Sequence, residues 1–246
     1  MSNQAAHRQT LPRVDLAVSR LGFGGAPLGD LYQRLDDRVA IEAVSAAADA
    51  GVSLFDTSPL YGHGLSEHRI GTGLRRAGPG ADREGYAGGL PFAARFDYSR
   101  EGALRSAEGS LHRLGRARLD ILLVHDVDVW THGADAIEGR FREAIGGACR
   151  ALSELKREGV VSAIGVGVNE AAMASRFMAE ADIDVVMLAG RHTLLEQEAL
   201  PFLAAAAARG VAVLLGGVFN SGVLATGAVP GARWNYRAAP PDVLDR

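Results

Sequence analysis

The sequence has 246 residues, of which 48% are hydrophobic and 22% are charged, and its formal net charge is −3. This composition is typical of a globular protein, and the length suits one large domain or two small ones. The net charge is weakly negative and indicates no basic surface, so nucleic acid is not an expected partner. The single cysteine, Cys149, excludes a disulfide framework within the chain and favours a reducing compartment.

Targeting signals and membrane spans are not apparent. Residues 1–20 are polar and lack the apolar core of a signal peptide. The longest apolar runs, such as residues 204–208 and 211–215, are too short to cross a bilayer, so no membrane partner is expected. We therefore expect a cytoplasmic protein, and the sequence gives no indication of its oligomeric state.

Hydrophobic periodicity predicts that strands and helices alternate along most of the chain. After a short hairpin through residues 14–18, we expect strands over residues 21–25, 52–55, 119–124, 160–168, 185–189 and 211–215, and helices over residues 36–50, 66–74, 99–114, 136–158, 170–181 and 197–209. Residues 127–135 are predicted to be a loop, and a helix is expected to start near Pro240. Repeated strand–helix units with polar residues after successive strands favour a parallel barrel or a doubly wound sheet.

The stretch from Gly51 to Gly62 contains the strongest candidate for chemistry. Its apolar run ends on Asp56, and Tyr61 follows five residues later in a loop that Ser58-Pro59 breaks. Alternating β/α folds place their chemistry at the carboxyl ends of strands, which favours a functional role for this carboxylate. The alternative is that Asp56 simply caps the next helix.

Several nucleotide and metal motifs are missing from the sequence. No Gly-x-Gly-x-x-Gly lies between a strand and a helix, and no Gly-Lys-Ser/Thr occurs, so neither a Rossmann site nor a P-loop is supported. His125 with Asp126 and Asp128 is the nearest approach to a metal-binding cluster, and it does not amount to one. No metal is therefore expected.

Two stretches of sequence together resemble the signatures of the aldo-keto reductase family. The first runs from Phe55 to Gly62 and continues through Ser66-Glu67 and Ile70-Gly71, and the second comprises residues 110–114 and 119–125. Residues 125–133, 165–170 and 216–222 resemble the branch that contains L-fucose, D-threo-aldose and pyridoxal dehydrogenases. The resemblance extends over roughly residues 14–246, and we expect a single domain over residues 1–246.

The resemblance implies an α/β fold, the eight-stranded (β/α)8 TIM barrel, and hydride transfer between NAD or NADP and a small carbonyl or alcohol substrate. Asp56, Tyr61 and His125 match three members of the family's catalytic tetrad. A phenol has a pKa of about 10, so Tyr61 needs a positive neighbour to exchange protons at neutral pH. His125 is expected to orient the substrate oxygen. The resemblance further implies cofactor contacts from Gly25, Ala26, Asp56, Asn169, Phe219, Asn220 and Ser221, and a substrate-pocket wall at Trp130.

The chain departs from the family at two places. The tetrad lysine, which ends the family's third strand, is missing: residues 77–99 are expected to be a loop, and the only lysine is Lys156 near the end of a long helix. We interpret Lys156 as a solvated charge that the helix dipole favours. Arg83 and Arg95 could supply charge, but a guanidinium is not equivalent to an ammonium. The sequence also ends before the family's eighth strand and final helices, so we expect an incomplete barrel.

Two interpretations remain open from the sequence. The chain is either a dehydrogenase of sugars or pyridoxal-like small alcohols and aldehydes, impaired by the missing lysine, or a catalytically inactive remnant or fragment that binds ligand weakly. A third strand over residues 86–92, with another group in place of the lysine, would favour the first interpretation.

Overall fold

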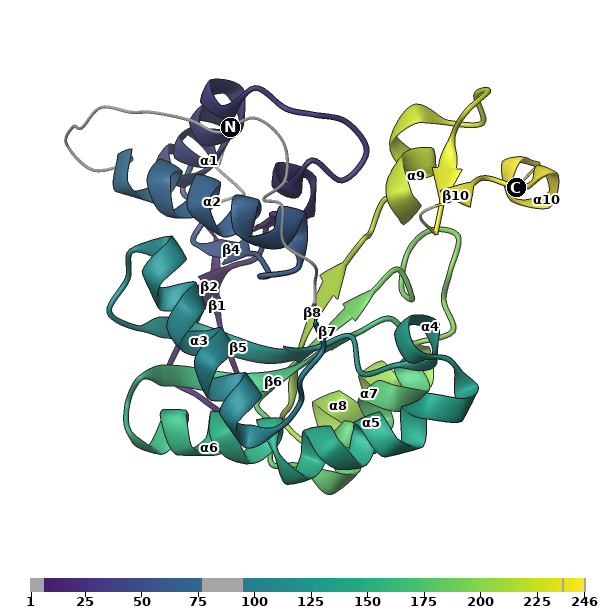
Figure 1. Cartoon of the computed structure of the whole chain (residues 1–246). Coiled ribbons are helices and arrows are strands. Elements are labelled where there is room, and N and C mark those ends of the chain that lie inside the picture. The colour runs from purple at the N-terminus through teal and green to yellow at the C-terminus, as the bar shows by residue number, and fades with distance from the viewer. Residues whose placement is uncertain (1–6, 77–94, 236, 246) are drawn as a thin grey trace. The chain divides into compact units, whose positions relative to one another are not determined.

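The computed structural model describes residues 7–76, 95–235 and 237–245 (Figure 1). The chain divides into two compact units. The first unit comprises Met1–Leu11, Asp15–Asp97 and Glu101–Asp120, and the second comprises Pro12–Val14, Tyr98–Arg100 and Ile121–Arg246. Each unit is described by itself below.

The first unit contains two small sheets. A hairpin is present, but β1 (Arg8–Thr10) and β2 (Ala17–Ser19) form it by antiparallel pairing, so it begins earlier than the residues 14–18 expected for it. The strand expected over residues 52–55 is β4 (Leu54–Asp56), and it pairs in parallel with β3 (Gly22–Gly24), with Gly24 opposite Asp56. This register places the glycine-rich turn after β3 beside the carboxylate that ends β4.

Helices complete the first unit. They are the 3-10 turns η2 (Ala26–Gly29) and η3 (Tyr61–Gly64) and the helices α1 (Asp37–Asp49), α2 (Leu65–Arg76) and α3 (Arg100–Leu114), the last of which belongs to this unit from Glu101 onwards. Asp36 begins α1 by accepting a 3.2 Å hydrogen bond from the Val39 amide, as its position in the sequence predicts. The core of the unit consists of Leu28, Ala40, Val44, Ile70 and Leu114.

A buried arginine of α2 holds the loop between η2 and α1. Arg69 is only 2% exposed, and its guanidinium donates to the carboxylates of Asp30 and Asp37, at 2.6 and 2.8 Å, and to the carbonyls of Leu28 and Leu35. A planar guanidinium suits this fork of acceptors. The loop is therefore fixed to α2 through one charged side chain.

The second unit is built on a four-stranded sheet in the order β5–β6–β7–β8. The strands are β5 (Leu119–His125), which starts at the end of the first unit, β6 (Val161–Val168), β7 (Val185–Ala189) and β8 (Ala212–Gly216). β6 and β7 pair in parallel, as do β7 and β8. Parallel strands are covered on both faces, which explains why β6 is buried over nearly its whole length.

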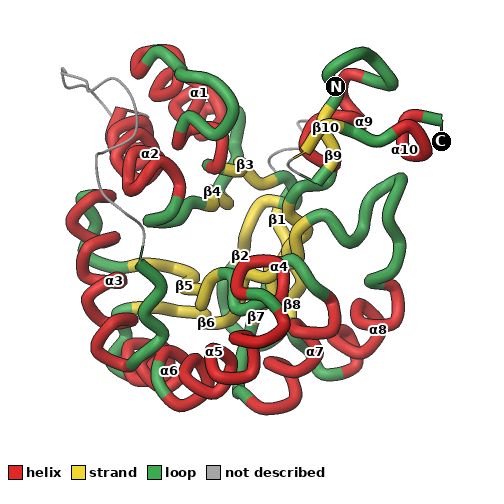
Figure 2. The backbone as a smooth tube through the Cα atoms, turned by 45° about the vertical axis from the view of Figure 1, so that its right-hand side comes forward, coloured by secondary structure: helices red, strands yellow, loops and turns green. Residues whose placement is uncertain are grey.

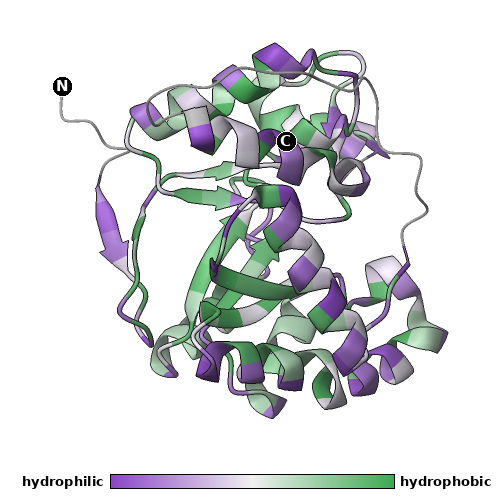
Figure 3. Ribbon diagram, turned by 60° about the vertical axis from the view of Figure 1, so that its left-hand side comes forward, coloured by the Kyte–Doolittle hydropathy of each residue, from purple (hydrophilic) through white to green (hydrophobic). Residues whose placement is uncertain are grey.

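Helices of the second unit cover one side of this sheet. They are α5 (Ala134–Gly146), α6 (Ala148–Arg157), α7 (Ala171–Glu180) and α8 (Leu200–Ala208) (Figures 1 and 2). Figure 3 shows strands that are hydrophobic over most of their length, and helices that carry both hydrophilic and hydrophobic residues. Phe141 of α5 packs edge-on against Phe177 of α7, with ring centroids 4.8 Å apart. Cys149 is buried in α6, and burial raises the pKa of its thiol to about 11.

The segment after β8 in the sequence forms several short helices and strands. They are η4 (Asn220–Gly222), α9 (Val223–Thr226), the antiparallel pair β9 (Arg233–Trp234) and β10 (Arg237–Ala238), and α10 (Pro241–Leu244). The helix expected near Pro240 is therefore present, with Pro241 in its first turn. None of the helices in the described ranges is long and apolar enough to cross a membrane.

Two expectations for the region between β5 and β6 are wrong. The predicted loop over residues 127–135 contains a short helix, α4 (Val129–His132), because the Asp128 carboxylate accepts from the Thr131 amide at 2.9 Å and caps its first turn. The long helix expected over residues 136–158 is interrupted at Gly147, whose φ of −113° and ψ of −81° are not helical. A side chain at Gly147 would meet the backbone of Tyr98, so close approach explains the break.

The remaining expected strands and helices are confirmed, with boundaries shifted by a few residues. Of the loop predicted over residues 77–99, residues 95–99 contain no helix or strand. Residues 77–94, including Arg83 and the alternative strand over residues 86–92, lie outside the described residues.

Replacing Arg69 by methionine should destabilise the protein by about 3–5 kcal/mol, because two carboxylates would lose their buried cation. Urea unfolding measures this change. Arg38→Ala is the control, since Arg38 forms only an exposed 3.6 Å pair with Glu42, and it should cost less than about 1 kcal/mol. Equal losses for the two variants would contradict the anchoring role of Arg69.

Candidate active site

Polar residues follow the strands of both units at their carboxyl ends. Asp56 is the last residue of β4, and His125 is the last residue of β5. Asn169 comes directly after β6, Arg191 lies two residues after β7, and η4 starts four residues after β8. In parallel β/α folds this is the end of the strands at which active sites are built.

The first unit brings four of the predicted residues together. The Gly25 amide donates to the Asp56 carbonyl at 2.8 Å, and Ala26 follows in η2. A Cβ at Gly25 would overlap this carbonyl and the Ser66 hydroxyl, so the turn requires glycine. Tyr61 begins η3, and its amide donates to the Ser58 carbonyl at 3.0 Å.

The loop that carries Tyr61 is packed closely against η2. Gly62 has φ of 62°, and a Cβ there would lie 2.7 Å from the carbonyl oxygen of Gly29. A Cβ at Gly29 would in turn overlap the backbone of Tyr61. The close contact between the backbones at Gly29 and Gly62 fixes the loop that follows β4.

In the second unit, the chain turns sharply directly after His125. Asp126 has φ of 56°, in the left-handed region that non-glycine residues rarely adopt, although aspartate tolerates it better than most. Its amide donates to the Gly167 carbonyl of β6 at 2.8 Å. The turn brings Oδ1 of Asp126 to 3.4 Å from Nε2 of His125.

Tyr98 fixes this turn through hydrogen bonds from its hydroxyl group. It is 5% exposed, and its hydroxyl donates to the carbonyls of His125 and Asp126, at 2.9 and 3.2 Å, and lies 2.8 Å from Nε2 of His132 in α4. Its own carbonyl accepts from the Ala148 amide at 2.8 Å. Burial, with smaller contributions from the charges of Asp126 and Asp128, raises the pKa of Tyr98 above its ordinary value of 10.

A fully buried carboxylate joins the ends of β5 and β6. Asp128 is 0% exposed, and its Oδ2 accepts from the Asn169 amide at 2.8 Å and from the Asn169 side chain at 2.9 Å. The Asn169 side chain also lies 3.3 Å from Oδ1 of Asp126. Glu170 accepts from the amides of Val129 and Trp130 at the start of α4. These contacts fix α4 against the end of β6.

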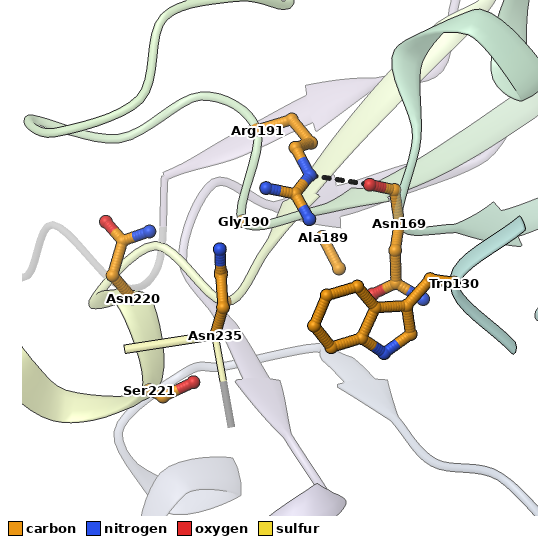
Figure 4. Close-up of a pocket in the computed structure, with 9 residues that line it drawn as sticks. Trp130, Asn169, Ala189, Gly190, Arg191, Asn220, Ser221 and Asn235 are labelled. Carbon is orange, nitrogen blue, oxygen red and sulfur yellow. Dashed lines mark hydrogen bonds between the residues drawn. The ribbon is translucent and has the colours of Figure 1, made fainter. Parts of the chain in front are cut away.

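A pocket of the second unit is lined by residues from the ends of β6, β7 and β8 and from the segments that follow (Figure 4). Arg191, 15% exposed, donates from Nε to the Asn169 carbonyl at 2.6 Å and lies 3.5 Å from Glu198. The residues with side chains at this pocket include Trp130, Asn169, Arg191, Asn220, Ser221 and Asn235.

Asn220 is the most unusual residue of this pocket. It is only 2% exposed, yet neither Oδ1 nor Nδ2 of its amide has a hydrogen-bond partner within the part of the chain that is described. Asn220 and Ser221 both have left-handed backbone angles, with φ of 48° and 61°. A buried amide without a partner costs about 1–3 kcal/mol, which makes Asn220 a candidate ligand-binding group.

The predicted site residues therefore fall into two groups. Asp56, Tyr61, Gly25 and Ala26 gather in the first unit around the end of β4. In the second unit, Asn169, Asn220, Ser221 and Trp130 line one pocket. His125 and Phe219 do not line it, and Phe219 is 59% exposed. Trp130 is 45% exposed, and its ring lies 5.1 Å from the Arg237 guanidinium.

The interpretation of Lys156 as a solvated charge is wrong. Its Nζ lies 2.6 Å from Oδ2 of Asp184, a carboxylate that is 4% exposed and also accepts from the Ile164 amide at 3.0 Å. The buried carboxylate thus holds the ammonium at the end of α6. The only lysine of the sequence is engaged in a structural ion pair.

Sequence reasoning missed three residues of these sites, namely Tyr98, Arg191 and Asn235. Arg191 follows a predicted strand, and that position was a usable signal for it. Tyr98 lies at the edge of a predicted loop and Asn235 lies in the C-terminal segment, so neither carried a comparable signal. Among the residues that the structure describes, no group of three or more His, Cys, Asp or Glu side chains is placed to hold a metal ion.

Tyr98→Phe should destabilise the protein by about 1–3 kcal/mol at neutral pH, because two buried carbonyls lose their donor. The pKa of Tyr98 is raised in the folded protein, so its contribution is complete below about pH 10 and is lost as the pH rises further. Urea unfolding from about pH 9 to about pH 11 should therefore show the two proteins converging, by up to about 1.4 kcal/mol per pH unit. A difference that stays constant would contradict the buried, neutral phenol.

The comparisons with known proteins agree with these features. Residues 20–244 match the profile of the Aldo/keto reductase family. Pyridoxal 4-dehydrogenase of Microbacterium luteolum is 37% identical over 275 residues, which cover 100% of this chain and 80% of that protein. D-threo-aldose 1-dehydrogenase of a Pseudomonas species is 35% identical over 94% of this chain and 75% of its own length.

Solved structures show the same relationship. A putative aldo-keto reductase from Pseudomonas aeruginosa superimposes with a TM-score of 0.65 at 29% identity, over 86% of this chain and 78% of its own. The holo form of an aldo-keto reductase from Bacillus halodurans superimposes with a TM-score of 0.71 over 92% of this chain and 72% of its own, and at 22% identity it supports the fold alone.

The fold expected from the sequence is thereby confirmed: the strands and helices described here are those of an incomplete (β/α)8 barrel. Members of this family use NAD or NADP as the hydride carrier, as expected from the resemblance. The profile match, the curated relatives and the polar residues at the strand ends lead to one conclusion. This chain belongs to the aldo-keto reductase family.

Proposed function

We propose that the protein is an NAD(P)-dependent dehydrogenase that oxidises a sugar, or a pyridoxal-like small alcohol or aldehyde, by hydride transfer. The observation that carries this proposal is the set of family motif residues at the strand ends: Asp56 ends β4, Tyr61 begins η3, and His125 ends β5. Two curated relatives, at 37% and 35% identity, are a pyridoxal 4-dehydrogenase and a D-threo-aldose 1-dehydrogenase. We also propose that residues 1–246 belong to a single barrel domain.

The residues present fit a nicotinamide cofactor. The buried Asn220 amide lacks a partner among the described residues, and it lies in one pocket with the Arg191 guanidinium and the Ser221 turn. Amide and guanidinium groups suit the amide and phosphate groups of such a cofactor. When bound, the cofactor supplies the site that accepts or donates hydride. Gly25 and Ala26 in the first unit are proposed to contact it as well.

The roles of the remaining residues follow from their chemistry. Oxidation of an alcohol requires that a proton leaves the hydroxyl as hydride leaves the carbon, so a group near the oxygen must accept that proton. The family resemblance makes Tyr61 and His125 the candidates for this group, and a hydrogen bond to the substrate oxygen is the further role it implies for His125. Trp130, with its exposed ring, is proposed to form part of the substrate pocket.

A second candidate function, that of a catalytically inactive ligand-binding protein, is favoured by one observation. The family's tetrad lysine has no counterpart, since Lys156 is paired with Asp184. A phenol with an ordinary pKa of about 10 is deprotonated in only about one molecule in a thousand at pH 7. Measured turnover decides between the two functions.

The test uses the purified chain with NAD or NADP and three substrates: L-fucose, a D-threo-aldose and pyridoxal. We expect reduced cofactor to form, measured by its absorbance, with at least one of these. Tyr61→Phe should lower kcat/KM at least about tenfold through the lost hydrogen bond, and up to about 10⁴-fold if the phenol also transfers the proton. Cofactor binding without turnover in the unsubstituted protein would support the inactive binding protein instead.

Lys156→Met should reduce stability and leave the turnover rate within about twofold of the unsubstituted protein. Because Lys156 is partly exposed, the expected loss of stability is about 1–3 kcal/mol, below that of a fully buried pair. Arg157→Ala, an exposed neighbour on the same helix, is the matched control and should change neither quantity. A folded Lys156→Met protein that turns over slower by about two orders of magnitude or more would show that Lys156 is catalytic.

A further inference from the structure

The missing lysine raises the question of which group accepts the proton during alcohol oxidation, and the turn after β5 offers an answer. Successive side chains of a β-strand point to opposite faces, so neighbouring residues at a strand end do not normally meet. His125 and Asp126 are an exception. The left-handed conformation of Asp126, φ of 56°, folds its carboxylate back to 3.4 Å from Nε2 of His125.

This conformation is held by contacts on every side of the turn. The Asp126 amide donates to the Gly167 carbonyl at 2.8 Å, and the Asp126 carbonyl accepts from the Tyr98 hydroxyl. The Asn169 side chain, itself fixed to the buried Asp128, lies 3.3 Å from the same oxygen that faces His125. A left-handed non-glycine residue costs about 1–3 kcal/mol and persists only where the surroundings hold it, often at functional sites.

A carboxylate beside an imidazole has a defined chemical consequence. The carboxylate stabilises the protonated ring, so the imidazole accepts a proton more readily during alcohol oxidation. The protonated ring can then return the proton when the carbonyl is reduced. The side chains of His125 and Asp126 are 32% and 17% exposed, so the pair is only partly screened by solvent. An imidazole, with a pKa of about 6.5, is also far closer to neutral pH than a phenol at about 10.

We propose that Asp126 is a positioning residue that makes His125 the proton acceptor and donor of this enzyme, in place of a lysine-assisted Tyr61. This inference rests on the proposed dehydrogenase function. In the oxidation, the substrate C–H bond breaks and its electron pair leaves as hydride to the nicotinamide cofactor, which is reduced. The O–H bond breaks, its electron pair forms the carbonyl, and the proton binds a ring nitrogen of His125. Asp126 stabilises the resulting imidazolium.

Other titratable groups face this pair. Asp128 and His132 of α4 act on Asp126, and the Tyr98 hydroxyl bonds the carbonyls of both residues of the pair. Arg140 and Glu143 of α5 act on Tyr98, and Arg140 also acts on His132. Burial raises the pKa of Asp126, and the His125 ring and the Asn169 hydrogen bond act in the opposite direction. Burial and Arg140 lower the pKa of His132, so that ring tends to be neutral beside Tyr98. Asp126 is the carboxylate in direct contact with His125.

The test measures the pKa of the His125 ring by NMR titration of the whole protein without substrate. His125→Asn identifies the signal, because that one resonance disappears. We expect the signal in Asp126→Asn to titrate at lower pH than in the unsubstituted protein, because the ring loses the carboxylate 3.4 Å from its Nε2. Asparagine tolerates the left-handed conformation, so the backbone should be retained. Asp126→Gly is the second variant, because glycine adopts this conformation without strain and also removes the carboxylate.

Glu138→Gln is the matched control. It removes one carboxylate from α5, whose partners are Arg142 and Arg176, and it should leave the His125 pKa unchanged. In turnover assays with any accepted substrate, Asp126→Asn should shift the ionisation in the pH profile of kcat/KM by the amount seen in the titration. A His125 pKa that is the same in both Asp126 variants and the unsubstituted protein would overturn the proposal. Because the titration needs no turnover, it decides on the pair even if the proposed activity fails.

Discussion

The hydrogen bonds around the end of β5 are the constraint on which the second unit depends most. Tyr98 bonds the carbonyls of two consecutive residues, His125 and Asp126, and Asp128 bonds both the backbone and the side chain of Asn169. These buried contacts fix the turn after β5, the start of α4 and the end of β6 relative to one another. They also account for the break between α5 and α6, because Gly147 must pass close to the backbone of Tyr98.

The residues that match the family's catalytic motif are divided between the two units, and their surroundings differ. The first unit keeps Asp56 and Tyr61 on a tightly packed loop. Its lysine partner is absent from the sequence, and the one lysine present neutralises Asp184 far along the chain. The second unit keeps His125 and adds a carboxylate next to its ring. This difference is the reason why we propose an imidazole, and not a phenol, as the group that exchanges the proton.

Much of the fold and part of the site were predictable from the sequence. Strong periodic runs such as residues 119–125 and 161–168 identify their strands, and Asp36 and Gly51 mark the ends of α1 by well-understood capping chemistry. The strand ends then point to Asp56, His125 and Asn169, and the family motif adds Tyr61.

The remainder depends on tertiary contacts that local patterns do not encode. The break at Gly147 is set by the backbone of Tyr98, which lies far earlier in the chain, and the periodicity of α5 and α6 continues across it. Lys156 has the local pattern of a solvated helix-end charge, yet its partner carboxylate, Asp184, comes from a later segment and is buried. The unpartnered amide of Asn220 and the left-handed turn at Asp126 are likewise properties of the folded backbone.

The central claim is that an imidazole handles the proton during alcohol oxidation. The most direct measurement is the pH dependence of the hydride-transfer rate in single turnovers of the unsubstituted enzyme with excess cofactor. The claim predicts a rate that rises through one ionisation near neutral pH and then levels off, as an imidazole paired with a carboxylate requires. A rate that keeps rising until about pH 9 or above, where a phenol without a cation ionises, would contradict it.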